Sequence, residues 1–127
     1  MRVMVFGTYD VLHKGHLYFL NQAKKLGDYL VVVIARNVTV KRIKNITSHH
    51  DETQRMQAVE KTGIADKVIL GDDPASFQCI INEKPDIICL GYDQDSRKVE
   101  KEFPKIKYVR IDAYHPHIYK SSKIRPP

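Results

Sequence analysis

His13 and His16 are the side chains of this sequence best placed to do chemistry. They are three residues apart, so one turn of helix puts both imidazole rings on the same side, and Gly15 between them leaves room for a bulky ligand. They follow a short apolar run and the turn Gly7-Thr8-Tyr9-Asp10, and a helical pattern begins at this point. The first turn of a helix attracts phosphate through its backbone N–H groups and its dipole. The pattern therefore predicts a phosphate site.

Two imidazoles at such a site can donate hydrogen bonds to phosphate oxygens whose negative charge grows in a transition state. Gly7 would let the backbone approach a ligand closely. Two alternatives stay open from the residues alone. The histidines could be two surface side chains, or they could be half of a zinc site to which Asp10 contributes, although the neighbouring sequence holds no third ligand at an obvious zinc spacing.

Further candidates follow the other predicted strands. Asp93 comes after a strand and could accept hydrogen bonds from a nucleotide, or could belong to a simple turn. Tyr119 could stack on a base or pack in the core. Ser121 and Ser122 could offer hydroxyls and helix N–H groups to a phosphate, or could cap a helix. Lys44, on a polar loop, could reach a triphosphate, and Lys41 competes with it for that role.

Apolar runs alternate with helical patterns along the whole chain. The expected strands are residues 3–6, 29–35, 67–70, 87–90 and 107–111, and the expected helices are residues 15–26, 51–61, 75–83, 95–103 and 121–124. Gly27 stands where a glycine often ends a helix, and Asp51 with Gln54 resembles a capping box. This alternation predicts an α/β fold, a doubly wound parallel sheet of five strands, in one domain that spans residues 1–127.

Composition narrows the function classes. The chain has 127 residues, 43% of them hydrophobic and 28% charged, which suits one domain with a core. Its apolar runs are too short to cross a bilayer and it shows no signal-peptide pattern, so we expect a cytoplasmic protein that does not bind membranes. Cys79 and Cys89 match no metal spacing and are expected to be buried reduced thiols. The net charge of +6 is compatible with nucleic acid or with a phosphorylated small substrate, and the scattered positions of Lys and Arg argue against a nucleic-acid-binding module.

The segments Gly7-Thr8-Tyr9-Asp10 and His13-Lys14-Gly15-His16 together resemble the first signature of the cytidylyltransferase-like nucleotidyltransferases. Residues 121–125 are similar to their second signature, a Ser/Thr-rich start of a late helix. The resemblance covers essentially the whole chain. It implies a Rossmann-like fold and the transfer of a nucleotide from a triphosphate to a phosphorylated small-molecule acceptor, with release of pyrophosphate.

Within this family the chain resembles the archaeal-type FAD synthases, which join AMP from ATP to FMN, in residues 34–41, 84–94 and 119–122. It departs from them in two places, because residues 44–48 replace their Lys-Gly-x-Lys-Pro loop and their late Cys-Pro is absent. The alternative is a glycerol-3-phosphate or other alcohol-phosphate cytidylyltransferase that uses CTP. Those enzymes carry an arginine where this chain has His115, so we expect ATP to be preferred. A nucleotide sensor without turnover is the alternative outside enzymes.

The resemblance also implies roles for individual residues. His13 and His16 would bind the phosphates and stabilise the transition state, Lys44 and Arg55 would hold the β- and γ-phosphates, and Asp10 would orient the loop or a Mg²⁺ ion that accompanies the triphosphate. The expected nucleotide-binding set is Gly7, Thr8, Tyr9, Asp10, His13, Gly15, His16, Asp93, Tyr119, Ser121 and Ser122. A homodimer is expected from the family as well.

Overall fold

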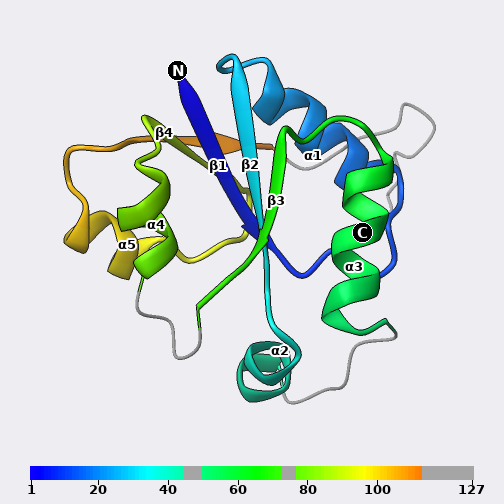
Figure 1. Cartoon of the computed structure of the whole chain (residues 1–127). Helices are drawn as coiled ribbons and strands as arrows, with labels where there is room; N and C mark the ends of the chain where they lie inside the picture. The colour runs from blue at the N-terminus through cyan, green and yellow to red at the C-terminus, as the bar shows by residue number, and fades with distance from the viewer. Residues whose placement is uncertain (45–49, 73–76, 113–127) are drawn as a thin grey trace.

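The computed structural model describes residues 1–44, 50–72 and 77–112, with the backbone alone for residues 42–44. Five strands and five helices alternate through these residues (Figure 1). The strands are β1 (Arg2–Gly7), β2 (Tyr29–Ile34), β3 (Lys67–Leu70), β4 (Ile87–Gly91) and β5 (Lys107–Ile111). The helices are α1 (Lys14–Lys24), α2 (Asn37–Lys44), α3 (Glu52–Lys61), α4 (Gln78–Glu83) and α5 (Arg97–Glu102).

The strands form one parallel sheet in the order β3-β2-β1-β4-β5, as the alternating pattern predicts. Helices α1 and α3 cover one face of this sheet, and α4 and α5 cover the other (Figure 1). The chain runs outward from β1 through β2 to β3, and then crosses back to β4 on the opposite side of β1. The strand order therefore reverses between β1 and β4, and sheets of this kind bind ligands at the carboxyl ends of such a strand pair.

Apolar side chains on both faces of the three central strands make the core. On the α1 and α3 face, Val5 and Val32 pack with Leu20 and Val59. On the α4 and α5 face, Met4, Val31 and Ile88 pack with Ile80. All five residues of β2 after Tyr29 are buried, which is what a central parallel strand with helices on both sides requires. The predicted α/β fold and its five strands are confirmed.

Gly27 is required for a different reason from the predicted one, which was the termination of a helix. Helix α1 ends at Lys24 and its C-cap, Lys25, stays right-handed, so Gly27 is not a left-handed terminator. A Cβ on Gly27 would lie 2.4 Å from the carbonyl oxygen of Met1 and 2.8 Å from a methyl carbon of Val3. A glycine is needed because the chain passes against the beginning of β1.

The other differences concern helices. The sequence patterns did not predict α2. They also predicted α4 and α5 to begin earlier than they do, since α4 begins at Gln78 and α5 at Arg97. The expected Asp51–Gln54 capping box is confirmed, since each backbone N–H bonds the other residue's side chain, at 3.0 and 2.8 Å. The expected helix at residues 121–124 lies outside the described residues.

Candidate active site

The two histidines of the predicted phosphate site open α1. His13 is the N-cap residue, and its Nδ1 accepts a hydrogen bond from the backbone N–H of Gly15 at 3.0 Å. His16, three residues on, accepts a hydrogen bond on its own Nδ1 from the N–H of His13 at 3.3 Å. The two rings stack, with their centroids 4.0 Å apart and their planes 28° apart. The pair is thus a reciprocal cap in which imidazoles do what a serine and a glutamate usually do.

This capping arrangement decides where the ring protons lie. A neutral imidazole has one N–H donor and one acceptor, and in both rings a backbone N–H occupies Nδ1 as an acceptor. The proton of each neutral ring therefore resides on Nε2. His13 and His16 present two Nε2–H donors side by side at the positive end of α1, which suits the oxygens of a phosphate.

Tyr9 lies against the ring of His16. Its backbone is left-handed (φ 50°), its side chain is only 4% exposed, and its ring meets the ring of His16 edge-on at 5.5 Å. A Cβ on Gly7 would lie 2.6 Å from the Tyr9 ring, so Gly7 makes room for this tyrosine. Burial raises the pKa of the Tyr9 hydroxyl, which has no hydrogen-bond partner in the described structure. Tyr9 thus supports the His16 ring in this structure.

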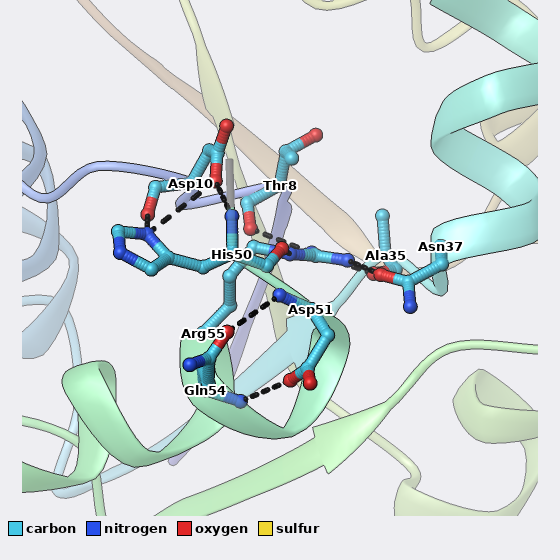
Figure 2. Close-up of polar contacts among 8 residues, drawn as sticks. All are labelled: Thr8, Asp10, Ala35, Asn37, His50, Asp51, Gln54 and Arg55. Atoms are coloured by element: carbon cyan, nitrogen blue, oxygen red, sulfur yellow. Dashed lines mark hydrogen bonds and ion pairs between the residues drawn. The ribbon is translucent and has the colours of Figure 1, made fainter. Parts of the chain in front are cut away.

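Asp10 is tied to the residue that precedes α3. The N–H of His50 donates to Asp10 Oδ1 at 2.9 Å, and His50 Nδ1 lies 3.1 Å from the backbone carbonyl oxygen of Asp10 (Figure 2). These contacts join two loops that are 40 positions apart in the chain. Sequence reasoning missed His50, since nothing in a local pattern pairs it with so distant a residue. The expected role of Asp10 in orienting the loop stays a prediction.

Arg55 lies differently from the expectation that it holds the β- and γ-phosphates. Its side chain reaches back from α3 and is fully buried (Figure 2). Nη1 donates to the carbonyl oxygens of Thr8 and Ala35 at 2.9 and 2.7 Å, and Nε donates to that of His50 at 3.2 Å. Nη2 donates to Oδ1 of Asn37 at 2.8 Å. The side chain has no exposed surface, so a phosphate contact would require the groups around it to move.

Nearby carboxylates offset part of the cost of burying the charge of Arg55. Burial lowers the pKa of Arg55, and the carboxylates of Asp10, Glu52 and Asp51 act in the opposite direction. The charge is therefore retained inside the protein with acidic groups around it. The bonds of Arg55 join the loop after β1, the end of β2 and the beginning of α2 to α3, so this side chain holds together the elements around the histidine pair.

The first turn of α2 is a second junction that sequence reasoning missed. The N–H of Asn37 donates to Glu52 Oε1 at 2.8 Å, which links α2 directly to α3. Beside it, Arg36 donates from Nε to the carbonyl oxygen of Gly71 at 2.7 Å. The carboxyl ends of β2 and β3 are therefore fastened to the same pair of helices. The interacting residues are 15 to 35 positions apart, so only the fold brings them together.

The remaining predicted residues fall into two groups. Asp93 lies exposed in the turn after β4, at the carboxyl edge of the sheet where Gly7 ends β1. The sequence predicted this location for Asp93, because the residue follows a predicted strand. Tyr119, Ser121 and Ser122 lie outside the described residues, as does the side chain of Lys44, the last residue of α2.

Two adjoining cavities open at the carboxyl ends of β1, β2 and β3. The smaller, about 190 Å³, is lined mostly by apolar side chains, among them Phe6, Val33 and Phe77, and also by Gly7 and Thr39. The hydroxyl of Thr39 is buried there without a hydrogen-bond partner among the described residues. The larger, about 830 Å³, is lined mainly by polar side chains from α2, α3 and the end of β3. Within the described part of the chain, Gly7 is the one predicted site residue that lines either cavity.

Metal-ligating side chains are sparse in the described residues. No group of three or more histidines, cysteines, aspartates or glutamates there is arranged to hold an ion. This donor set does not fit a cage built by protein side chains alone. It does fit Mg²⁺, which is commonly held by one or two carboxylates together with the phosphates of a nucleotide, and Asp10 is the carboxylate beside the histidine pair.

None of the helices in the described ranges is long and apolar enough to span a membrane. This finding concerns those helices alone, and the expected cytoplasmic location stays a prediction from the sequence.

Comparisons with known proteins agree with the resemblance noted in the sequence. The family model described as Cytidylyltransferase-like matches residues 4–126. A FAD synthase of Thermoplasma volcanium is 39% identical over 98% of this chain and 92% of its own length. A FAD synthase of Archaeoglobus profundus is 44% identical over 96% of this chain and 81% of its own.

A solved structure gives the same result for the fold. The crystal structure of a Thermoplasma volcanium protein described as the lipopolysaccharide core biosynthesis protein is 40% identical to this chain, with a TM-score of 0.83 over 90% of this chain and 98% of that one. Pantothenate synthetase from Thermus thermophilus, at 13% identity and a TM-score of 0.60, shares the fold alone.

Proposed function

Because the chain belongs to the Cytidylyltransferase-like family, we propose that it is an FMN adenylyltransferase, which joins AMP from ATP to FMN and releases pyrophosphate. The observation that carries this proposal is the stacked pair His13 and His16 at the beginning of α1, in which each Nδ1 accepts a backbone N–H. The relatives named FAD synthase, at 39% and 44% identity over nearly the whole chain, support FMN as the acceptor.

The reaction needs little covalent chemistry from the protein. A phosphate oxygen of FMN attacks the α-phosphorus of ATP, the bond from that phosphorus to the bridging oxygen of the β-phosphate breaks, and the electron pair leaves with pyrophosphate. Catalysis then rests on positioning and on neutralising charge. His13 and His16 donate their Nε2 protons as hydrogen bonds to phosphate oxygens and stabilise the charge that develops there. Mg²⁺, when bound with the triphosphate, supplies further positive charge.

Arg55 and His50 act in this scheme through other groups. Arg55 holds the carbonyl of Thr8, and His50 holds Asp10, so both fix the loop that leads into the histidine pair. Lys44 remains our candidate for the β- and γ-phosphates, with Lys41 as its competitor. Tyr119, Ser121 and Ser122 remain candidates for the nucleotide, as proposed from the family resemblance.

We assign the ring system of the acceptor to the smaller cavity. A flavin has a broad apolar ring system whose one polar edge carries carbonyl and N–H groups. The 190 Å³ cavity offers Phe6, Val33 and Phe77 to an apolar ring. Thr39 lines it too, and its covered hydroxyl, which lacks a partner among the described residues, would turn toward a polar edge of the ring. Gly7, which lines the cavity, also begins the loop that leads to the histidines, so an acceptor bound there would lie next to the phosphate site.

The test combines each nucleotide with each acceptor. Purified protein with Mg²⁺ is given ATP or CTP together with FMN, glycerol-3-phosphate or phosphocholine, and pyrophosphate release and the dinucleotide product are both measured. We expect turnover with ATP and FMN to exceed that with every other pair, with FAD as product. Faster turnover of CTP with an alcohol phosphate would replace the proposal by the cytidylyltransferase alternative. Nucleotide binding without turnover of any pair would favour a sensor.

A further inference from the structure

The carboxyl ends of β1 and β4 separate where the strand order reverses. β1 keeps its register with β2 as far as Gly7, opposite Ile34, but its register with β4 ends at Val5, opposite Cys89. Phe6 of β1 and Gly91 of β4 lie just beyond that last pair. Their backbone groups are of the type that would bond each other if the ladder continued.

The side-chain amide of Gln94 occupies this gap. Its Oε1 accepts from the N–H of Gly91 at 2.8 Å, and its Nε2 donates to the carbonyl oxygen of Phe6 at 2.8 Å. A primary amide has the same donor and acceptor as a peptide group, so it serves both strands at once. At this point the Gln94 side-chain amide bridges β1 and β4 in place of a direct backbone hydrogen bond between them.

The turn that carries Gln94 is fixed from the other side by β5. Arg110 donates from Nη1 to the carbonyl oxygens of Gly91 and Gln94 at 2.7 and 2.9 Å, and from Nη2 to Oγ of Ser96 at 3.2 Å. The Ser96 hydroxyl, nearly buried, also bonds the carboxylate of Glu100. The segment between β4 and α5 is therefore held against β5, and the Gln94 amide links it to β1.

We propose that Gln94 is a positioning residue for the nucleotide: its amide sets the separation of β1 and β4 and holds the turn with Asp93 at the distance from the histidine loop that a nucleoside triphosphate requires. The inference rests on the proposed function, because it assumes that a nucleotide binds between these strand ends. Gln94 acts through the two strands and through Asp93. It is a different residue from those that the family resemblance assigns to the nucleotide.

The experiment uses variants that keep the length of the side chain. Gln94→Met removes both hydrogen bonds, and Gln94→Glu keeps the acceptor for Gly91 but places a carboxylate oxygen against the carbonyl of Phe6. We expect both variants to raise the KM for ATP and its Kd at least tenfold and to leave the KM for FMN within twofold, with Gln94→Glu the more affected. The same changes at Gln57, which is exposed on α3, are the controls and should alter neither KM more than twofold.

A purely structural role for Gln94 would change both KM values or the thermal stability alone. An unchanged KM for ATP, or equal increases for ATP and FMN, would overturn the inference while the proposed function stands. If the wild-type protein binds no nucleoside triphosphate, both fail together.

If the variants do not fold, a measurement on the wild-type protein tests the positioning role of Gln94. In a ¹H–¹⁵N spectrum, the side-chain amide of Gln94 and the backbone amide of Gly91 should shift when a non-hydrolysable ATP analogue binds, and should stay in place when FMN alone is added. Two resonances that do not respond to the analogue would contradict the inference.

Discussion

His16 is the residue on which the proposed chemistry can be tested most directly. Its Nδ1 serves the fold by accepting from the N–H of His13, while its Nε2 is the donor assigned to the phosphate. His16→Asn keeps an acceptor near the position of Nδ1 and has no atom near that of Nε2, whereas His16→Gln can place an N–H near Nε2. We expect kcat to fall about 10²–10³-fold in His16→Asn, the loss typical of one transition-state donor, and to fall less in His16→Gln.

Asn21→Ala on an exposed position of the same helix is the control, and it should leave kcat unchanged. Circular dichroism would show that α1 still forms in all three proteins. If His16→Asn turned over FMN at near the normal rate, His16 would be a capping residue alone.

Arg55 gives a second prediction at this scale, about stability. Arg55→Met keeps an extended apolar stem and leaves the carbonyls of Thr8 and Ala35 and the side chain of Asn37 without their donor. A buried polar group that loses its partner costs about 1–3 kcal/mol, so we expect the free energy of unfolding to fall by at least about 2 kcal/mol. Urea denaturation measures this.

The control for Arg55→Met is Arg97→Met, since Arg97 is exposed and bonds only Asp95 among the described residues. It should change the stability by less than about 0.5 kcal/mol. If the two variants lost the same stability, the buried bonds of Arg55 would contribute little to the fold.

The residues that the sequence could and could not assign differ in the range of their contacts. His13 and His16 act on each other and on Gly15, so their spacing and the glycine turn before them were enough to predict their location. His50 and Arg55 act on residues up to 40 and 47 positions away, and no local pattern carries that information. Arg55 in particular occurs in a helical pattern like that of any surface arginine.

At the scale of elements, the smaller cavity depends on α2, which the sequence patterns missed. Residues 37–44 combine β-branched and charged residues, and within residues 37–41, where side chains are described, Val40 is the buried one. Their helical state is supported by contacts at its first turn with Glu52. The strands were easier to predict, because buried central strands are continuous apolar runs, and β3 and β5 have the bounds that the sequence indicated.

Thr39 on α2 gives the prediction that belongs to this cavity. Its hydroxyl is buried and lacks a partner among the described residues, so Thr39→Val should leave the protein equally stable or more stable. If FMN uses this hydroxyl, the same variant should raise the KM for FMN about five- to tenfold, since one hydrogen bond contributes about 1 kcal/mol, and should leave the KM for ATP unchanged.

Thermal unfolding and steady-state kinetics on the same preparation separate the two effects for Thr39→Val. Thr53→Val, at an exposed position of α3, is the matched control. A KM for FMN that does not change would remove Thr39 from the acceptor site.

The whole molecule responds to alkaline pH through its two thiols. Cys89 is buried in β4 on the α1 and α3 face of the sheet, and Cys79 is buried in α4 on the opposite face. Burial raises the pKa of Cys89 to about 11, and burial together with the carboxylate of Asp72 raises that of Cys79 to about 12. Both thiols stay protonated in the native protein at a pH where they ionise in the unfolded chain. Ionisation of a thiol is therefore disfavoured in the core on both faces of the sheet.

The sign of the effect follows from these shifts. Between the unfolded pKa of about 8.5 and the raised native values, the native state binds more protons than the unfolded state, so stability is fully present below pH 8.5 and is lost as the pH rises. Each thiol contributes a slope that approaches about 1.4 kcal/mol per pH unit. Urea denaturation at pH 8 and pH 10 under reducing conditions should therefore show a decrease in the free energy of unfolding. The double variant Cys79→Ala/Cys89→Ala should show a smaller decrease, and an equal decrease in both proteins would mean that other groups cause it.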